Sequence, residues 1–101
     1  MRLSDRLIVS DPARESEWRQ IIERRLKKPV LYVICVPRAH SYPAEILPSQ
    51  EFYKTEEQQM AIGLADSYSA ALGLIKKAVE DALLTDPKLK NLKADFRERY
   101  I

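Results

Sequence analysis

The sequence predicts an α+β fold in which helix predominates, formed by a single domain over residues 1–101. Two observations lead to this prediction. An uninterrupted apolar run at residues 30–36 is typical of a buried strand, whereas longer segments repeat their apolar residues with helical spacing. A chain of 101 residues with 46% hydrophobic and 32% charged residues is long enough for one modest core but not for two.

Residues 6–10 are predicted as a short strand, with a turn of helix as the alternative. Ile8 and Val9 are β-branched, and Ser10-Asp11-Pro12 ends the run. The same punctuation begins a helix over residues 12–28, because proline suits the first helical position. The apolar residues of this helix lie on one stripe: Trp18, Ile21, Ile22 and Leu26.

Residues 30–36 give the strongest strand signal in the chain. The run is continuous rather than alternating, so both faces of the strand should be buried. If residues 6–10 pair with it, the intervening helix makes a parallel β-α-β unit. Two strands make a poor sheet. We therefore expect residues 38–53, or a second copy of the protein, to cover the remaining edge.

Residues 54–84 are predicted as one amphipathic helix, which at 1.5 Å per residue would be roughly 46 Å long. A globule of this chain length has a radius of gyration of only about 13 Å. The helix should therefore bend, at Gly63 or Gly73, or project beyond its own domain. One apolar row along it follows 4-3-4-3 spacing: Ala61, Ala65, Tyr68, Leu72, Ile75, Val79 and Ala82. A last helix is predicted over residues 87–100.

The predicted long helix has more apolar surface than one small domain can cover. This favours a small, non-enzymatic protein-interaction module. We expect it to self-associate, preferably as a homodimer, through the long helix or the open edge of the sheet. The predicted interface residues are Tyr68, Leu72, Ile75 and Val79. A different protein is the alternative partner.

The first functional alternative is a ligand-binding or catalytic role for the loop over residues 38–53. Arg38, His40 and Tyr42 follow the strong strand, where ligands commonly bind in α/β folds. An arginine can hold an anion, and histidine and tyrosine can exchange protons.

A second candidate ligand site lies on the first predicted helix. Arg14, Trp18 and Arg25 fall close to one line there, which sets two guanidinium groups beside an indole. The simpler interpretation is that the arginine stems pack on the edge of the core while their charged ends reach water.

The least favoured alternative is nucleic-acid binding through the basic segments 24–28 and 88–99, since the net charge is only +2 and acidic residues are interspersed. The sequence predicts no catalytic set, metal site or cofactor, and Cys35 lacks a CxxC partner. The apolar runs are too short to span a membrane, and residues 1–6 lack the features of a secretory signal. The expected compartment is the cytoplasm, without membrane contact.

Overall fold

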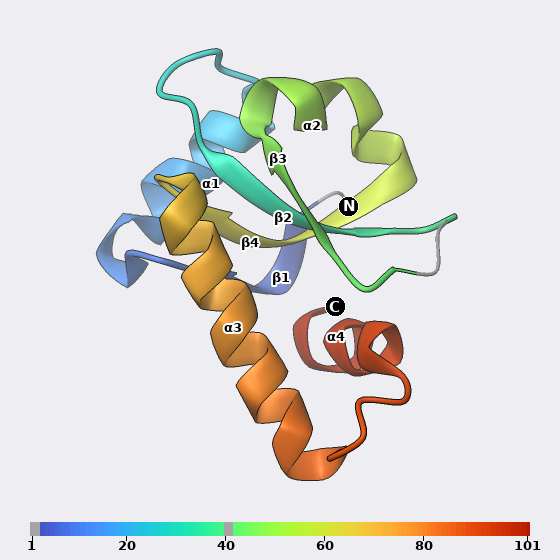
Figure 1. Ribbon diagram of the computed structural model, residues 1–101. Coiled ribbons are helices and arrows are strands. Elements are labelled where there is room, and N and C mark those ends of the chain that lie inside the picture. Colours follow the sequence, from blue (N-terminus) through green and yellow to red (C-terminus); the bar gives the residue numbers. More distant parts are fainter. Residues whose placement is uncertain (1–2, 40–41) are drawn as a thin grey trace.

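The protein is an α+β fold in which helices cover both faces of a mixed sheet (Figure 1). The computed structural model describes residues 3–39 and 42–101. Within them the strands are β1 (Leu3–Val9), β2 (Tyr32–Pro37), β3 (Glu45–Pro48) and β4 (Gln59–Ala65). Their order across the sheet is β1-β4-β2-β3, with β1 parallel to β4 and β2 antiparallel to both of its neighbours. The prediction of a helix-dominated α+β fold is confirmed.

Each face of the sheet carries its own pair of helices. A short 3-10 helix, η1 (Pro12–Arg14), leads into α1 (Glu15–Glu23), which shares one face with α2 (Ser49–Thr55). A second 3-10 helix, η2 (Glu56–Gln58), joins α2 to β4. The other face is covered by α3 (Tyr68–Thr85) and α4 (Leu92–Tyr100).

Strand β2 lies inside the sheet with both faces buried, as its continuous apolar run predicts. Val33 and Cys35 belong to the core under α1 and α2, while Ile34 and Val36 belong to the core under α3 and α4. Burial raises the pKa of the Cys35 thiol, so this cysteine stays protonated within the core.

The expected pairing of the first two strands is wrong. Residues 6–10 do form part of a strand, but β1 pairs in parallel with β4, which lies between β1 and β2. The other edge of β2 is covered from within residues 38–53, which is one of the two expected arrangements, because this segment contains β3 and the start of α2. A second copy is therefore not needed at that edge.

The predicted helix over residues 54–84 is also wrong, since this region contains the end of α2, then η2, β4 and most of α3. Small apolar residues around Gly63 repeat with a spacing that suits a helix, but they fit a strand buried on both faces equally well. Gly63 lies opposite Ile34 of β2, and a Cβ atom at Gly63 would lie 2.8 Å from Ile34 Cδ1. Glycine therefore permits the close approach of β4 to β2.

Other helix boundaries also differ from the predicted ones. Helix α1 ends at Glu23 rather than at residue 28, and Arg25 adopts a left-handed backbone with φ of 56°. Helix α3 begins where the Ser67 hydroxyl accepts a hydrogen bond from the amide of Ala70 at 3.1 Å. Helix α4 begins at Leu92 rather than at residue 87.

Helix α3 is short enough to fit within its own domain. Its 18 residues are about 27 Å long, within the 39 Å longest dimension of the protein. Gly73 does not mark a close approach, because nothing lies within 4 Å of the position that its Cβ atom would take.

Candidate functional site

The predicted trio of Arg14, Trp18 and Arg25 does not come together in the structure. Trp18 is only 2% exposed and packs in the core beneath α1. Arg14 lies in η1 and pairs with Glu17 at 3.4 Å. Arg25 lies beyond the end of α1, so the three residues do not share one helix.

Arg25 instead ties the end of α1 to α2 and η2. Its guanidinium donates to the carboxylate of Glu56, which is only 5% exposed, and to the carbonyl oxygen of Tyr53 at 3.0 Å. The guanidinium also lies 5.8 Å from the centre of the Tyr53 ring. The Tyr53 hydroxyl donates in turn to the carbonyl oxygen of Leu26 at 2.8 Å. These contacts give Arg25 a structural role in joining α1 to α2.

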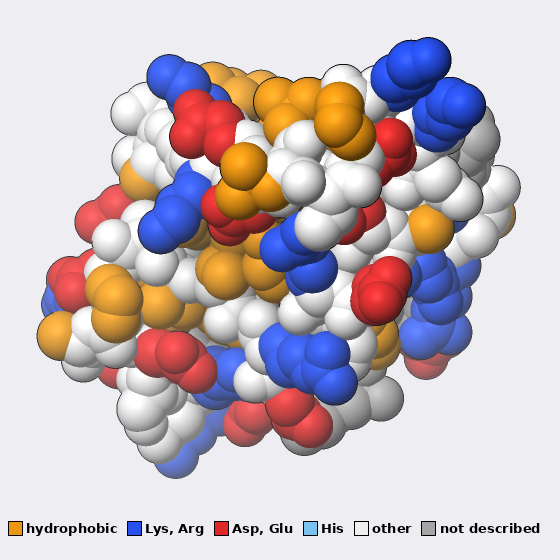
Figure 2. Space-filling view, turned by 90° about the horizontal axis from the view of Figure 1, so that it is seen from below, with side chains coloured by type: hydrophobic (Ala, Val, Ile, Leu, Met, Phe, Trp, Pro, Cys, Tyr) orange, Lys and Arg blue, Asp and Glu red, His pale blue; other side chains and the backbone are white. Residues whose placement is uncertain are grey.

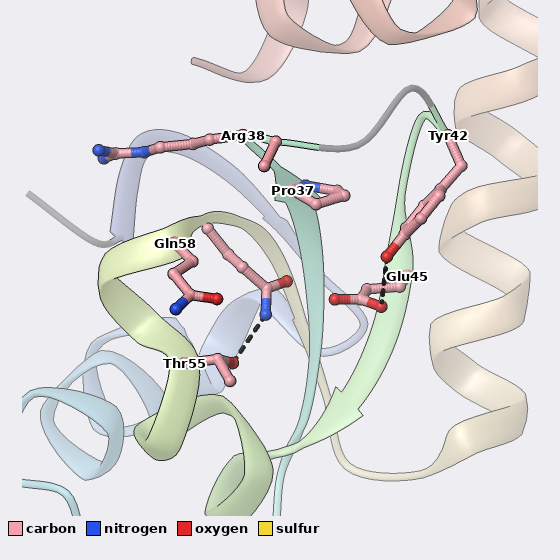
Figure 3. A pocket seen from close by; sticks show the side chains of 8 residues that line it. Pro37, Arg38, Tyr42, Glu45, Thr55 and Gln58 are labelled. Carbon is pink, nitrogen blue, oxygen red and sulfur yellow. Dashed lines mark hydrogen bonds between the residues drawn. The ribbon is translucent and has the colours of Figure 1, made fainter.

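A pocket of about 360 Å³ lies beside the end of β2, between the β2–β3 connection and η2 (Figure 3). Two of the predicted ligand residues, Arg38 and Tyr42, line it, and His40 lies outside the described residues. The full lining consists of Pro37, Arg38, Ala39, Tyr42, Glu45, Thr55, Gln58 and Gln59.

The polar side chains of the pocket come from both of its walls (Figure 3). On one wall the Tyr42 hydroxyl donates to Glu45 Oε2 at 3.4 Å. Desolvation, and then the Glu45 carboxylate, raise the pKa of Tyr42, so its hydroxyl keeps the proton at neutral pH. On the other wall Gln59 Nε2 donates to Thr55 Oγ1 at 2.7 Å. The Arg38 side chain extends away from Glu45.

Sequence reasoning missed Thr55, Gln58 and Gln59 as pocket residues. The sequence prediction places all three in one helix over residues 54–84, whereas they occupy the end of α2, η2 and the first position of β4. Pairing of Gln59 with Pro37 across β4 and β2 brings this wall against the β2–β3 connection. That pairing is a long-range contact with no local signal in the sequence.

Helix α3 carries the second candidate surface. Seven large hydrophobic residues are exposed in the described chain, and four lie on α3: Tyr68 (53%), Leu72 (48%), Leu83 (40%) and Leu84 (83%). The predicted interface residues Ile75 and Val79 are half-buried against the core beneath α3. The residues of α3 that are fully buried are all alanines: Ala71, Ala78 and Ala82. Seen from below the view of Figure 1, the surface shows hydrophobic side chains among charged ones (Figure 2).

The two basic segments lie in different layers of the protein. Residues 24–28 follow α1, while residues 88–99 lead into α4 and form most of it, on the opposite face of the sheet. Part of the positive charge of residues 88–99 is already paired, because Arg99 donates to Asp95 at 3.0 Å and to Thr85 Oγ1 at 3.2 Å. Binding of nucleic acid by both segments would therefore need two separate surfaces, and it stays a prediction.

Within residues 3–39 and 42–101 no cluster of three or more histidine, cysteine, aspartate or glutamate side chains could hold a metal ion. None of the helices described is both long and apolar enough to cross a membrane. No family model, curated protein or solved structure matches the chain.

Proposed function

We propose that this protein is a small, non-catalytic interaction module that forms a homodimer through helix α3. The main support for this proposal is which side chains of α3 face the core and which face solvent. Its fully buried residues are alanines, while its tyrosine and three of its leucines are exposed. Apolar side chains gathered on one exposed element are typical of an interaction surface.

The spacing of the exposed stripe suits a second copy of the same helix. Tyr68 and Leu83 are equally distant from the midpoint between residues 75 and 76, and so are Leu72 and Val79. Two α3 helices packed antiparallel about that midpoint would place Tyr68 opposite Leu83, and Leu72 opposite Val79. A two-fold axis requires this kind of self-complementary surface.

The edges of the sheet are less suited to self-association than α3. Along β1, Arg19 donates to the carbonyl oxygens of Ser4 at 3.1 Å and Asp5 at 3.3 Å, which occupies acceptors that another strand would need. At the other edge β3 has only four residues and ends at Pro48. Short strands and prolines are common protections against edge-to-edge pairing.

The stripe is small, which limits the strength of the proposed dimer. Stable interfaces usually involve about 20–30 residues from each partner. A stripe of four or five side chains on one helix is well below that size, so we expect a dimer that dissociates at micromolar concentration.

Sedimentation equilibrium across the micromolar range tests the proposal. Leu72→Lys should weaken dimerisation at least tenfold, because a charge would enter the apolar contact. Leu72 is 48% exposed, so the variant should keep its fold, which circular dichroism checks.

Leu84→Lys is the matched control. Leu84 is more exposed than Leu72 and lies about 120° further around the same helix, outside the stripe. Its substitution should leave dimerisation unchanged. A wild-type protein that stays monomeric throughout, or equal effects of the two substitutions, would contradict the proposal.

A further inference from the structure

We propose that the pocket between the β2–β3 connection and η2 binds a primary ammonium group. This inference is independent of dimerisation through α3. Gln59 is only 5% exposed and lines the pocket. Its side-chain oxygen is buried and has no hydrogen-bond partner within the described chain. Buried polar atoms are nearly always paired, so this acceptor calls for a donor beside it, from a ligand or from ordered water.

The hydrogen bonds around Gln59 determine which of its amide atoms is the unpaired one. Thr55 Oγ1 donates its hydrogen to the carbonyl oxygen of Glu51 at 3.4 Å. That hydroxyl must therefore accept at its second contact, which assigns the nitrogen of the Gln59 amide to the 2.7 Å bond. The unpaired atom of Gln59 is accordingly an acceptor and needs a donor.

The charges of the lining favour a cation. Two lining residues, Arg38 and Glu45, are charged. The Arg38 side chain points away from Glu45, whereas the Glu45 carboxylate lies by the Tyr42 hydroxyl within the pocket wall (Figure 3). Because the Tyr42 hydroxyl gives its hydrogen to Glu45, this pair presents acceptors rather than donors to a ligand.

An alkylammonium group fits these features. Its three N–H donors can bond to the Glu45 carboxylate and to Gln59 Oε1, and the bond to the carboxylate is charge-assisted. Pro37 and Ala39 supply apolar wall for the alkyl chain. At about 360 Å³ the pocket is near the lower end of the usual range for ligand sites, about 300–1,000 Å³. We therefore infer a small amine, or one lysine side chain of a polypeptide.

The test uses the full chain and n-butylamine hydrochloride, with binding followed by NMR at the backbone amides of Glu45, Gln58 and Gln59. We expect saturable shifts with butylammonium and none with butyrate, which has a similar chain but the opposite charge. Nα-acetyl-lysine-N-methylamide distinguishes the two sources of the group. Binding of both compounds indicates a lysine side chain, and binding of butylammonium alone indicates a free amine.

Two variants locate the interaction, and a third serves as a control. Glu45→Gln should weaken binding of butylammonium at least tenfold, and Gln59→Met should weaken it by a smaller factor. Glu57→Gln removes the same charge from an exposed residue of η2 outside the lining and should change nothing. If Gln59→Met does not fold, Glu45→Gln still decides the question, because Glu45 is only half-buried.

Three results would overturn the inference. They are the absence of saturable binding, a preference for butyrate, and equal loss of binding in Glu57→Gln and Glu45→Gln. The last would indicate general attraction of the cation to acidic surface. The first would leave ordered water as the donor to Gln59.

Discussion

Helices α1 and α3 cover opposite faces of the same sheet, but they use side chains of opposite size to do so. Helix α1 has nine residues and buries Trp18, Ile21 and Ile22. Helix α3 is twice as long, yet its fully buried residues are three alanines. Bulky side chains hold α1 to the sheet, whereas α3 fully buries only alanines, packs Leu74, Ile75 and Val79 partly against the core and leaves four large apolar side chains exposed. The comparison shows why apolar composition alone does not identify the inner face of a helix.

The largest expected effect is the loss of stability when a bulky residue of α1 is truncated, compared with the same truncation in α3. Trp18→Ala should lower the free energy of unfolding by about 3–5 kcal/mol, because it leaves a cavity in the core. Leu72→Ala should change it by no more than about 0.5 kcal/mol, since nearly half of Leu72 is exposed. Urea unfolding measures both. Alkylation of the buried Cys35 thiol, which requires opening of the core, gives an independent readout. A comparable loss in both variants would remove the contrast between α1 and α3.

The next effect concerns the ion pair that ties α1 to α2. Arg25→Met should lower the free energy of unfolding by about 2 kcal/mol, because it removes the ion pair of the buried Glu56 carboxylate. Arg14→Met is the control. The pair of Arg14 with Glu17 is more than half exposed on both sides, so its loss should cost less than about 0.5 kcal/mol. Similar losses in urea unfolding would argue against a structural role for Arg25.

The two glycines should give effects of opposite sign, and the effect at Gly73 should be the smallest of all. Gly63→Ala should destabilise the protein by about 1–3 kcal/mol, because its Cβ atom would meet Ile34 at 2.8 Å. Gly73→Ala should stabilise it by about 0.5–1 kcal/mol, because α3 has open space there and alanine favours helix. Thermal unfolding of the two variants measures both shifts. A destabilised Gly73→Ala would mean that something packs against this side of α3.

Sequence patterns predicted the elements whose signals are local. The stripe of Trp18, Ile21 and Ile22 predicted the buried face of α1, and the apolar run at residues 30–36 predicted β2 within two residues. The pattern failed over residues 59–65, where small apolar residues suit a helix and a doubly buried strand equally well. Ser67 was the overlooked signal, because its side chain caps α3 and separates that helix from β4.

The two candidate surfaces were predictable to different degrees. Tyr68 and Leu72 were identified from helical spacing alone. Both residues keep that spacing in α3, although this helix covers only residues 68–85. For the pocket, Arg38 and Tyr42 were identified from their place after a strand, but the opposite wall was not. That wall depends on the register of β4 against β2, which no short segment of sequence encodes.

The parallel pairing of β1 with β4 has a consequence for the order in which the chain can fold. Strands β2 and β3 are near neighbours in the sequence, whereas β1 must wait for a strand that begins only at Gln59. Closing so long a loop costs conformational entropy before any contact compensates it. During synthesis, Leu3 and Leu7 therefore lack their sheet partner until β4 has left the ribosome. The first strand of the chain is thus among the last to be placed.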